Sequence, residues 1–231
     1  MRVLVQNLCT PWLGALPDKK ARLKKFLALV DSYDLLLLQE LFTFWIPFGY
    51  SLGDHREWFS TQLYEKGFRY IFLPPPVVFG QDCGLVVASR MPVLNFRHIH
   101  FKSWWGTEAW TWKGAMSFKI ANTTFINTHL QSGDEDARLR QLDEVNDFCN
   151  TYPTVIAGDL NMDAFNQREN NKLQKRLPMF VDVQPKNLSM CSRYNDQRLE
   201  RVLVLGSVPM ECSMVDLEMS DHPGITIFLN K

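Results

Sequence analysis

The chain has no excess charge of either sign. Its 231 residues include 25 Lys and Arg against 25 Asp and Glu, so the formal net charge is zero. A protein that owes its affinity mainly to the phosphate backbone of duplex nucleic acid usually carries a basic excess. The neutral balance removes that argument for a nucleic-acid partner, although a local basic patch would suffice for one.

Long hydrophobic runs are also lacking. The longest aliphatic run, residues 35–38, is far too short to span a bilayer, and residues 1–7 read as a strand instead of a signal peptide. The cysteines are odd in number and form no C-x-x-C pair, which indicates reduced thiols. They are Cys9, Cys83, Cys149, Cys191 and Cys212. We therefore expect an intracellular, cytoplasmic protein without a transmembrane segment.

Repeats, low-complexity tracts and linkers are missing as well, so residues 1–231 are predicted to form one domain. Apolar patterns predict strands over residues 2–8, 34–40, 68–73, 83–89, 93–101, 112–120, 123–130, 154–157, 199–205, 208–215 and 225–229. Helices are expected after Asp18, over residues 55–66, after a capping box at Ser132–Glu135, and around residues 167–177. This order of elements indicates an α/β domain in which two sheets pack face to face with helices outside.

Polar side chains stand where the apolar strands end, or just beyond. Seven residues share this position: Asn7, Glu40, His129, Asp159, Asn161, Asp221 and His222. Ligands of layered α/β folds gather where strand ends and their loops converge. Each residue alone has an ordinary explanation, such as a turn cap at Asn7 or a solvated strand end at Glu40. The hypothesis of an active site therefore depends on the whole set.

The residue types in this set suit metal-assisted attack of water on phosphorus. Mg²⁺ takes oxygen ligands, typically one or two carboxylates, and binds substrate phosphate, a task that suits Glu40 with Asn7. An in-line attack also needs an activated water, which Asp159 or His222 would hold or deprotonate.

Two further needs of this chemistry have candidates. Negative charge that builds on the phosphoryl oxygens needs donors, and His129 and Asn161 have suitable groups. A carboxylate beside His222 would fix its tautomer and stabilise its charged form. Three alternatives stay open for that carboxylate: Asp221, Glu200 and Asp159.

Five short motifs occur in the order seen in the endonuclease/exonuclease/phosphatase superfamily, the group of pancreatic deoxyribonuclease. They are Gln6-Asn7, Leu38-Gln39-Glu40, Asn127-Thr128-His129-Leu130, Gly158-Asp159-Leu160-Asn161 and Ser220-Asp221-His222-Pro223. The resemblance covers nearly the whole chain. It implies a four-layer α/β sandwich with two mostly antiparallel sheets, and a Mg²⁺-dependent phosphoric diester hydrolase, with Mn²⁺ as the alternative ion. It also implies that Glu40 is the principal metal ligand, that Asn7 assists at the metal, and that Asp221 helps to hold the metal side of the site.

The same resemblance implies roles for the other residues. His129 and Asn161 would stabilise the pentacovalent transition state, and Asp159 would orient or deprotonate the water. His222 would act as general base or phosphate contact. Where the family has an Asp that hydrogen-bonds the final histidine, this sequence has Glu200. The extra methylene puts the partnership between Glu200 and His222 in question.

Three features resemble the neutral sphingomyelinase branch. These are residues 127–132 with the following Arg138, residues 82–93, and the stretch Trp112-Lys113-Gly114-Ala115, which has Glu108 upstream. Some members of the branch carry an acid that pairs with this lysine. The resemblance implies substrate-binding roles for Lys113 and Trp112, and predicts a phospholipid such as sphingomyelin as the substrate. Trp45, in the aromatic segment after Glu40, is a further predicted substrate-binding residue.

Apolar aromatic segments near the predicted site agree with a lipid substrate. Residues 42–48 form one such segment, residues 74–79 a second, and Trp104, Trp105, Trp110 and Trp112 a third. Aromatic rings favour the headgroup level of a bilayer, so we expect peripheral membrane contact here. Packing of the sandwich core, or base stacking in a single-stranded nucleic-acid groove, would also account for them.

Other features favour other activities. The strand at residues 199–204 resembles that of tyrosyl-DNA phosphodiesterases, and Arg168, Lys172, Lys175 and Arg176 would form a basic stripe on one helix. The alternatives are thus a DNA-processing phosphodiesterase of the tyrosyl-DNA, abasic-site or exonuclease type, and an inositol-polyphosphate phosphatase. A domain that has lost catalysis and only binds a partner is a further alternative, against which the five motifs argue.

Overall fold

The structure, a computed structural model, describes residues 1–10, 16–52, 55–103, 108, 110–149, 151–189 and 196–230. Trp104, Trp105 and Cys191 lie outside these ranges. The other four cysteines are free thiols. Among the described residues, no helix is both long and apolar enough to cross a membrane.

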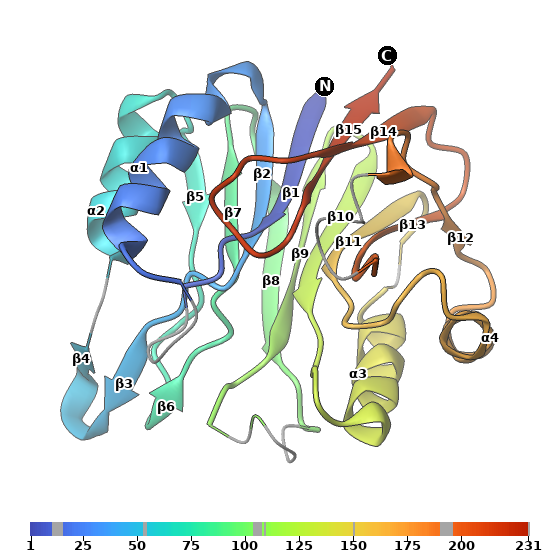
Figure 1. Ribbon diagram of the computed structural model, residues 1–231, viewed down its shortest axis with the longest axis horizontal. Helices are drawn as coiled ribbons and strands as arrows, with labels where there is room; N and C mark the ends of the chain where they lie inside the picture. The colour runs from blue at the N-terminus through green and yellow to red at the C-terminus, as the bar shows by residue number, and fades with distance from the viewer. Residues whose placement is uncertain are drawn as a thin grey trace.

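Two six-stranded sheets form the centre of the structure, and the pattern of parallel and antiparallel pairing is the same in both (Figure 1). The first has the order β14 (Met210–Val215), β15 (Gly224–Leu229), β1 (Arg2–Asn7), β2 (Leu35–Gln39), β7 (Val86–Ser89) and β5 (Tyr70–Phe72). The second has the order β12 (Val181–Asp182), β13 (Glu200–Leu205), β11 (Thr154–Asp159), β10 (Thr123–His129), β9 (Gly114–Ile120) and β8 (Leu94–His100). In each sheet the two central strands are parallel and all other neighbours are antiparallel.

Helices cover the outer face of each sheet. Helices α1 (Lys19–Leu29) and α2 (Arg56–Glu65), with the short η1 (Val30–Ser32), lie on the first sheet, and α3 (Glu135–Phe148) and α4 (Gln167–Arg176) lie on the second (Figure 1). The predicted four-layer sandwich with mostly antiparallel sheets is confirmed.

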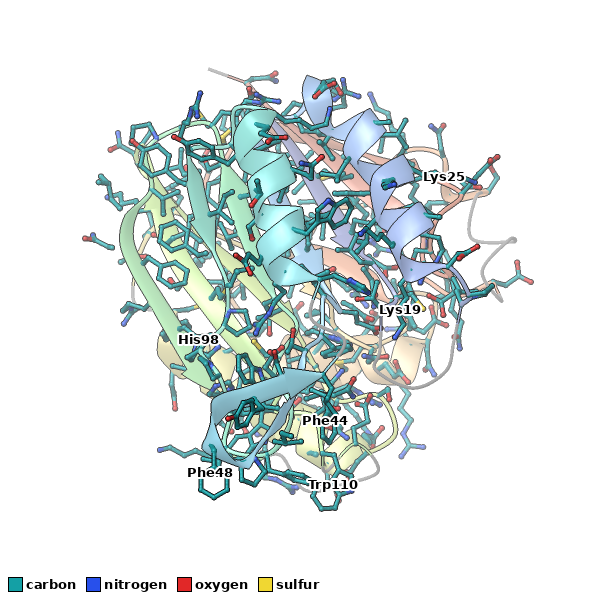
Figure 2. The ribbon with its side chains drawn as sticks, turned by 90° about the vertical axis from the view of Figure 1, so that its left-hand side faces the viewer. Lys19, Lys25, Phe44, Phe48, His98 and Trp110 are labelled. Carbon is teal, nitrogen blue, oxygen red and sulfur yellow. The ribbon has the colours of Figure 1, made fainter. Side chains whose placement is uncertain are left out.

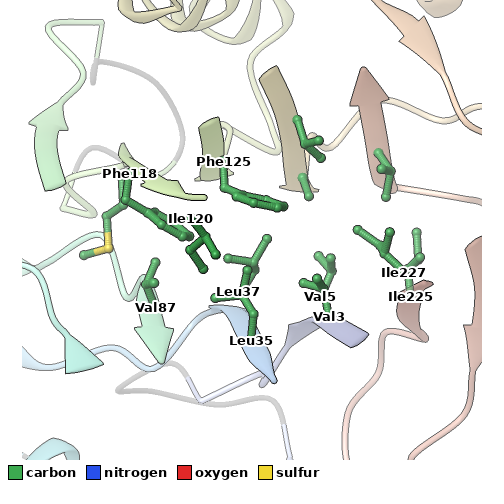
Figure 3. Packing of buried hydrophobic residues seen from close by; sticks show 14 of the residues in the cluster. Val3, Val5, Leu35, Leu37, Val87, Phe118, Ile120, Phe125, Ile225 and Ile227 are labelled. Atoms are coloured by element: carbon green, nitrogen blue, oxygen red, sulfur yellow. The ribbon is translucent and has the colours of Figure 1, made fainter. Parts of the chain in front are cut away.

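Strand β2 shows why the sequence folds this way. Successive strand residues point to opposite faces. Leu35 and Leu37 therefore enter the core between the sheets (Figure 3), whereas Leu36 and Leu38 pack beneath α1 and α2. All four are fully buried, and burial of each leucine contributes roughly 1.5–3 kcal/mol. A strand covered on both faces must be apolar at every position, as this one is until Gln39.

The structure differs from the sequence predictions after Glu40 and before α3. The aromatic segment at residues 42–48 contains a strand of a small third sheet, formed by β3 (Phe44–Ile46), β4 (Tyr50–Leu52) and β6 (Gly80–Gln81), with η2 (Pro47–Gly49) at its turn. The predicted capping box is wrong. Helix α3 is capped by Asp134, whose carboxylate accepts from Ala137 N at 2.9 Å, while Ser132 N donates to Glu108 at 3.0 Å.

Candidate active site

The two parallel strand pairs bring the predicted residues to one end of the sandwich. Asn7 ends β1 beside Gln39, and Glu40 follows directly. In the second sheet His129 ends β10 opposite Asp159, which ends β11 and faces Glu200 at the start of β13. Strands that run in parallel present the same ends at the same edge, so their terminal polar residues must meet.

Glu40 is held in an unusual backbone conformation. Its φ is +59°, and its carbonyl oxygen accepts from Thr10 N at 3.1 Å. A Cβ at Gly84 would lie 3.1 Å from Glu40 Cα and 2.6 Å from a carbon of the Phe42 ring, so the neighbouring segment needs glycine there. The Glu40 side chain is 18% exposed. Burial raises the pKa of its carboxyl group, whereas Lys113 and the hydrogen bond from Asn7 act in the opposite direction.

Asn7 ties two carboxylates together. Its Nδ2 donates to Glu40 Oε1 at 2.9 Å and to Asp159 Oδ2 at 3.1 Å, while its Oδ1 accepts from Cys9 N at 2.9 Å. The amide oxygen is the atom that would bind a metal, and here it faces the backbone. In this arrangement Asn7 positions Glu40 and Asp159.

Asp159 is fixed by close packing between the two parallel strands. Gly158 has a φ of +147°, and a Cβ there would lie 2.0 Å from Thr128 O, so only glycine fits. Asp159 Oδ1 accepts from Asn161 N at 2.8 Å. Asn161, with a φ of +49°, donates from Nδ2 to Leu130 O at 2.9 Å, which leaves one N–H of that amide for a substrate.

Lys113 lies deeper in the site than its predicted role in substrate binding suggests. Its Nζ is 2.8 Å from His129 Nε2 and 3.5 Å from Glu108 Oε2, and its side chain is only 1% exposed. Burial lowers the pKa of His129 well below its usual range, and the charges of Lys113 and His222 add to this effect. His129 is therefore a neutral imidazole whose Nε2 accepts a hydrogen bond from Lys113 Nζ. Phe42, at the start of the aromatic segment predicted at residues 42–48, packs beside His129 with ring centroids 6.3 Å apart.

The doubtful partnership between Glu200 and His222 is formed. His222 Nδ1 lies 2.5 Å from Glu200 Oε1 and 3.8 Å from Asp159 Oδ2. Burial lowers the pKa of His222, but the charges of Glu200, Asp159 and Asp221 outweigh it and raise that pKa to about 10. His222 is consequently an imidazolium at neutral pH. A protonated imidazole donates a hydrogen bond, so in this state His222 suits a contact to a phosphate oxygen, whereas the predicted role as general base requires that it first lose this proton.

Asp221 lies at the rim. Its side chain is 51% exposed, and its Oδ1 is 4.0 Å from His222 Nε2. Two groups of possible metal ligands lie at this end of the sandwich, and within each group the ligand atoms are no more than 4.8 Å apart. The first is Glu40 with His129 and Asp159, and the second is Asp159 with Glu200 and His222. Asp221 is in neither group. The carboxylates of Glu40 and Asp159 are the oxygen donors that suit Mg²⁺, whereas His222 in its charged form has no lone pair for a metal.

The two predicted tryptophans support loops beside the site. Trp45 is 9% exposed and donates from Nε1 to Asp82 Oδ2 at 2.9 Å. Trp112 donates to Phe79 O at 2.9 Å. Both indole N–H groups are thus used within the protein, and Lys113 is the predicted substrate-binding residue that reaches the other site residues.

Stability should depend on pH through the pair of His222 and Glu200. Because the pKa of His222 rises from 6.5 to about 10 on folding, the folded protein holds this proton more tightly than the unfolded chain does. The resulting stabilisation is complete below pH 6.5 and is lost as the pH rises towards 10. Denaturant titrations in EDTA should show the free energy of unfolding falling more steeply over this window in the wild type than in His222→Gln. Equal slopes would contradict the assignment of a charged His222.

The family model for the Endonuclease/Exonuclease/phosphatase family matches residues 7–186, and the chain belongs to this family of phosphate-ester hydrolases. No curated protein matches the sequence.

Sphingomyelinase C from Streptomyces griseocarneus has a similar structure, with a TM-score of 0.77, 17% identity and coverage of 99% of each chain. A double mutant of beta toxin from Staphylococcus aureus with bound magnesium ions has a TM-score of 0.72, 17% identity and 99% coverage of each chain. Truncated TDP2 from Caenorhabditis elegans has a TM-score of 0.65 and 17% identity, and the match covers 100% of this chain and 97% of that one. Identities this low bear on the fold alone.

Proposed function

We propose that this single domain is a Mg²⁺-dependent phosphodiester hydrolase, for which Mn²⁺ would substitute, and that its substrate is a phospholipid such as sphingomyelin. The observation that carries the reaction class is the pair of carboxylates, Glu40 and Asp159, joined by one amide of Asn7 and flanked by two cations. A divalent ion held by Glu40 would polarise the phosphoryl oxygen and neutralise its charge. The magnesium ions in the beta toxin structure support the choice of ion.

The residues of the chain then divide the remaining work. Asp159 accepts the proton of the attacking water; its Oδ2 lies between the two histidines, 3.5 Å from His129 Nε2 and 3.8 Å from His222 Nδ1. The charged His222 and the free N–H of Asn161 donate to the phosphoryl oxygens as their negative charge grows. Lys113 supplies a second positive charge beside neutral His129.

An exposed aromatic surface supports a lipid substrate. Phe48 is 97% exposed at the turn of the small sheet, and Trp110 is 65% exposed. Phe79 joins them, with ring centroids 5.5 Å from Phe44 and 5.3 Å from Trp110. Figure 2 shows Phe44, Phe48 and Trp110 gathered at one end of the molecule. The segment that begins at Phe44 follows Glu40 closely, and Trp110 precedes Lys113, so a headgroup bound at the site would place its chains near these rings.

The basic stripe gives less support to a nucleic-acid substrate. Lys172 forms an ion pair with Glu135, and Arg176 forms one with Asp143. Two of the four basic residues of the stripe are therefore paired with acids of α3, which weakens the attraction that the stripe would exert on a phosphate backbone.

The test is a panel of substrates with one protein. Sphingomyelin vesicles, a 5′-tyrosyl oligonucleotide, an abasic duplex, inositol polyphosphates and a soluble chromogenic diester are each assayed with Mg²⁺ and then with EDTA. We expect turnover of sphingomyelin and of the chromogenic diester, abolished by EDTA. Turnover of only a nucleic-acid or inositol substrate would overturn the lipid assignment, and metal-independent turnover would overturn the reaction.

The aromatic surface is tested by Phe48→Ser within the same panel. The Phe48 ring, partly buried in the bilayer, would contribute roughly 1 kcal/mol to the free energy of membrane binding. Its loss in Phe48→Ser should lower turnover on vesicles about fivefold. Hydrolysis of the soluble diester should be unchanged. Met179→Ser is the matched control because Met179 is 72% exposed on a different loop, and it should affect neither assay. An equal loss in Phe48→Ser and Met179→Ser would contradict membrane contact at this surface.

A further inference from the structure

A group of side chains that could hold a metal ion, none of which belongs to the carboxylate site, lies at the β7–β8 side of the sandwich. Cys83 stands in the segment that leads into β7 of the first sheet, and His98 and His100 lie on β8, the edge strand of the second. Residues two apart on a strand point to the same face. One ligand atom from each of the three lies within 4.8 Å of the other two. The group therefore bridges the two sheets.

The three side chains are oriented as ligands of a single ion would be. Cys83 Sγ lies 3.4 Å from His98 Nε2, and the rings of His98 and His100 are nearly perpendicular with centroids 4.5 Å apart. His100 Nδ1 lies 3.2 Å from the backbone oxygen of Trp112. A hydrogen bond from Nδ1 to a carbonyl fixes the tautomer that leaves Nε2 free, which is the usual outer-shell arrangement of a histidine that binds a metal.

The surroundings also suit a metal. Cys83 is fully buried, whereas His98 and His100 are partly exposed, so an ion and a water molecule can reach the group from solvent. Figure 2 shows His98 on the face turned to the viewer, beside the small sheet.

We propose that Cys83, His98 and His100 form a second metal site, for a thiophilic d¹⁰ ion such as Zn²⁺, with water as the fourth ligand. Sulfur and imidazole donors favour zinc over magnesium, so the two sites would take different ions. Binding breaks the S–H bond of Cys83, forms an S–Zn bond and releases one proton to solvent, with no change in oxidation state.

Occupancy of this site would also restrain two segments of the active site. Cys83 precedes Gly84, whose carbonyl oxygen accepts from Leu41 N at 2.8 Å next to Glu40. His100 contacts the backbone of Trp112, which precedes Lys113. The ion would thus join the two sheets at the point from which both segments depart.

The test uses Co²⁺ as a spectroscopic probe, with saturating Mg²⁺ present to occupy the carboxylate site. The wild type should show a thiolate-to-cobalt charge-transfer band with one Co²⁺ per chain, and Zn²⁺ should abolish the band by competition. Cys83→Ala should lose the band, and His98→Gln should weaken Co²⁺ binding at least tenfold. Zn²⁺ at a hundredfold excess over its Kd should raise the Tm of the wild type on the order of 5 °C and that of His98→Gln by less.

Two controls separate this site from the other buried thiols. Cys212 is buried on β14, with three strands between it and β7, and Cys9 lies near Asp221 at the active site. Cys212→Ala and Cys9→Ala should keep the band. Absence of a band in the wild type, or its loss in Cys9→Ala but not in His98→Gln, would overturn the proposal. His98 is partly exposed, so His98→Gln remains a valid test if Cys83→Ala fails to fold. The result is independent of any hydrolytic activity.

Discussion

Glu40→Gln is expected to lower kcat/KM for Mg²⁺-dependent hydrolysis of a phosphodiester by at least about 10³-fold. Of the two carboxylates joined by Asn7, Glu40 is the more exposed to solvent. Glutamine has the same shape as glutamate but carries no charge. The loss of charge weakens the hold on a divalent ion and thereby removes several kcal/mol of transition-state stabilisation. Steady-state kinetics on the chromogenic diester measure the effect, and calorimetric titration with Mg²⁺ should show weaker binding.

Glu57→Gln is the matched control for this substitution. Glu57 is exposed in the first turn of α2, so the same change of charge there should leave kinetics and Mg²⁺ binding unaltered. If Glu40→Gln kept more than a tenth of the activity, Glu40 would not be the principal metal ligand. A lowered Tm in EDTA would point to a structural role for Glu40 instead.

His222→Ala should abolish turnover while the fold stays intact. Donation of a proton or a charged hydrogen bond at the reacting group is typically worth about 10²–10⁴-fold, and His222 lies just before β15, outside the apolar clusters. Circular dichroism and the same kinetic assay measure fold and activity. Retention of more than about a tenth of wild-type activity would count against a catalytic role.

Glu200→Gln shows how His222 works. If the imidazolium is the active form, activity should decline on the alkaline side as His222 loses its proton. Glu200 raises the pKa of His222, so the variant should begin this decline at a lower pH than the wild type, with Mg²⁺ saturating in both. An unchanged pH profile would mean that Glu200 only packs beside the ring.

The central strands and the meeting of the site residues were predictable from the sequence, because both follow from local pattern. An apolar run such as Leu35–Leu38 fits only a strand covered on two faces, and polar residues that end neighbouring parallel strands meet at one edge. Strands β3, β4 and β6 were not predicted, since two or three residues are too few to show a period of two. The need for glycine at position 158 was not predictable either. It arises because the backbone oxygen of Thr128 on the neighbouring strand leaves no room for a Cβ.

Contacts between distant residues were the least predictable. The extra methylene of Glu200 raised doubt because the sequence does not say how far the next backbone lies, and in the structure Glu200 reaches His222. The approach of Lys113 to His129 depends on the pairing of β9 with β10 and on the course of the chain before β9. The group of Cys83, His98 and His100 was not predicted, since its members come from different sheets and each has an ordinary explanation as a buried residue.

The two parallel strands at the centre of each sheet affect which parts of the protein open locally. Local opening begins where few neighbours hold a segment and reaches central strands last. The strands that carry Asn7, His129 and Asp159 have a hydrogen-bonded strand on both sides, so their geometry should persist through fluctuations that detach the edges. The small sheet with Phe48 has only strands of two or three residues and should open readily. If the proposed function holds, the protein would combine a rigid reaction centre with a flexible surface that adapts to its substrate without displacing the reacting groups.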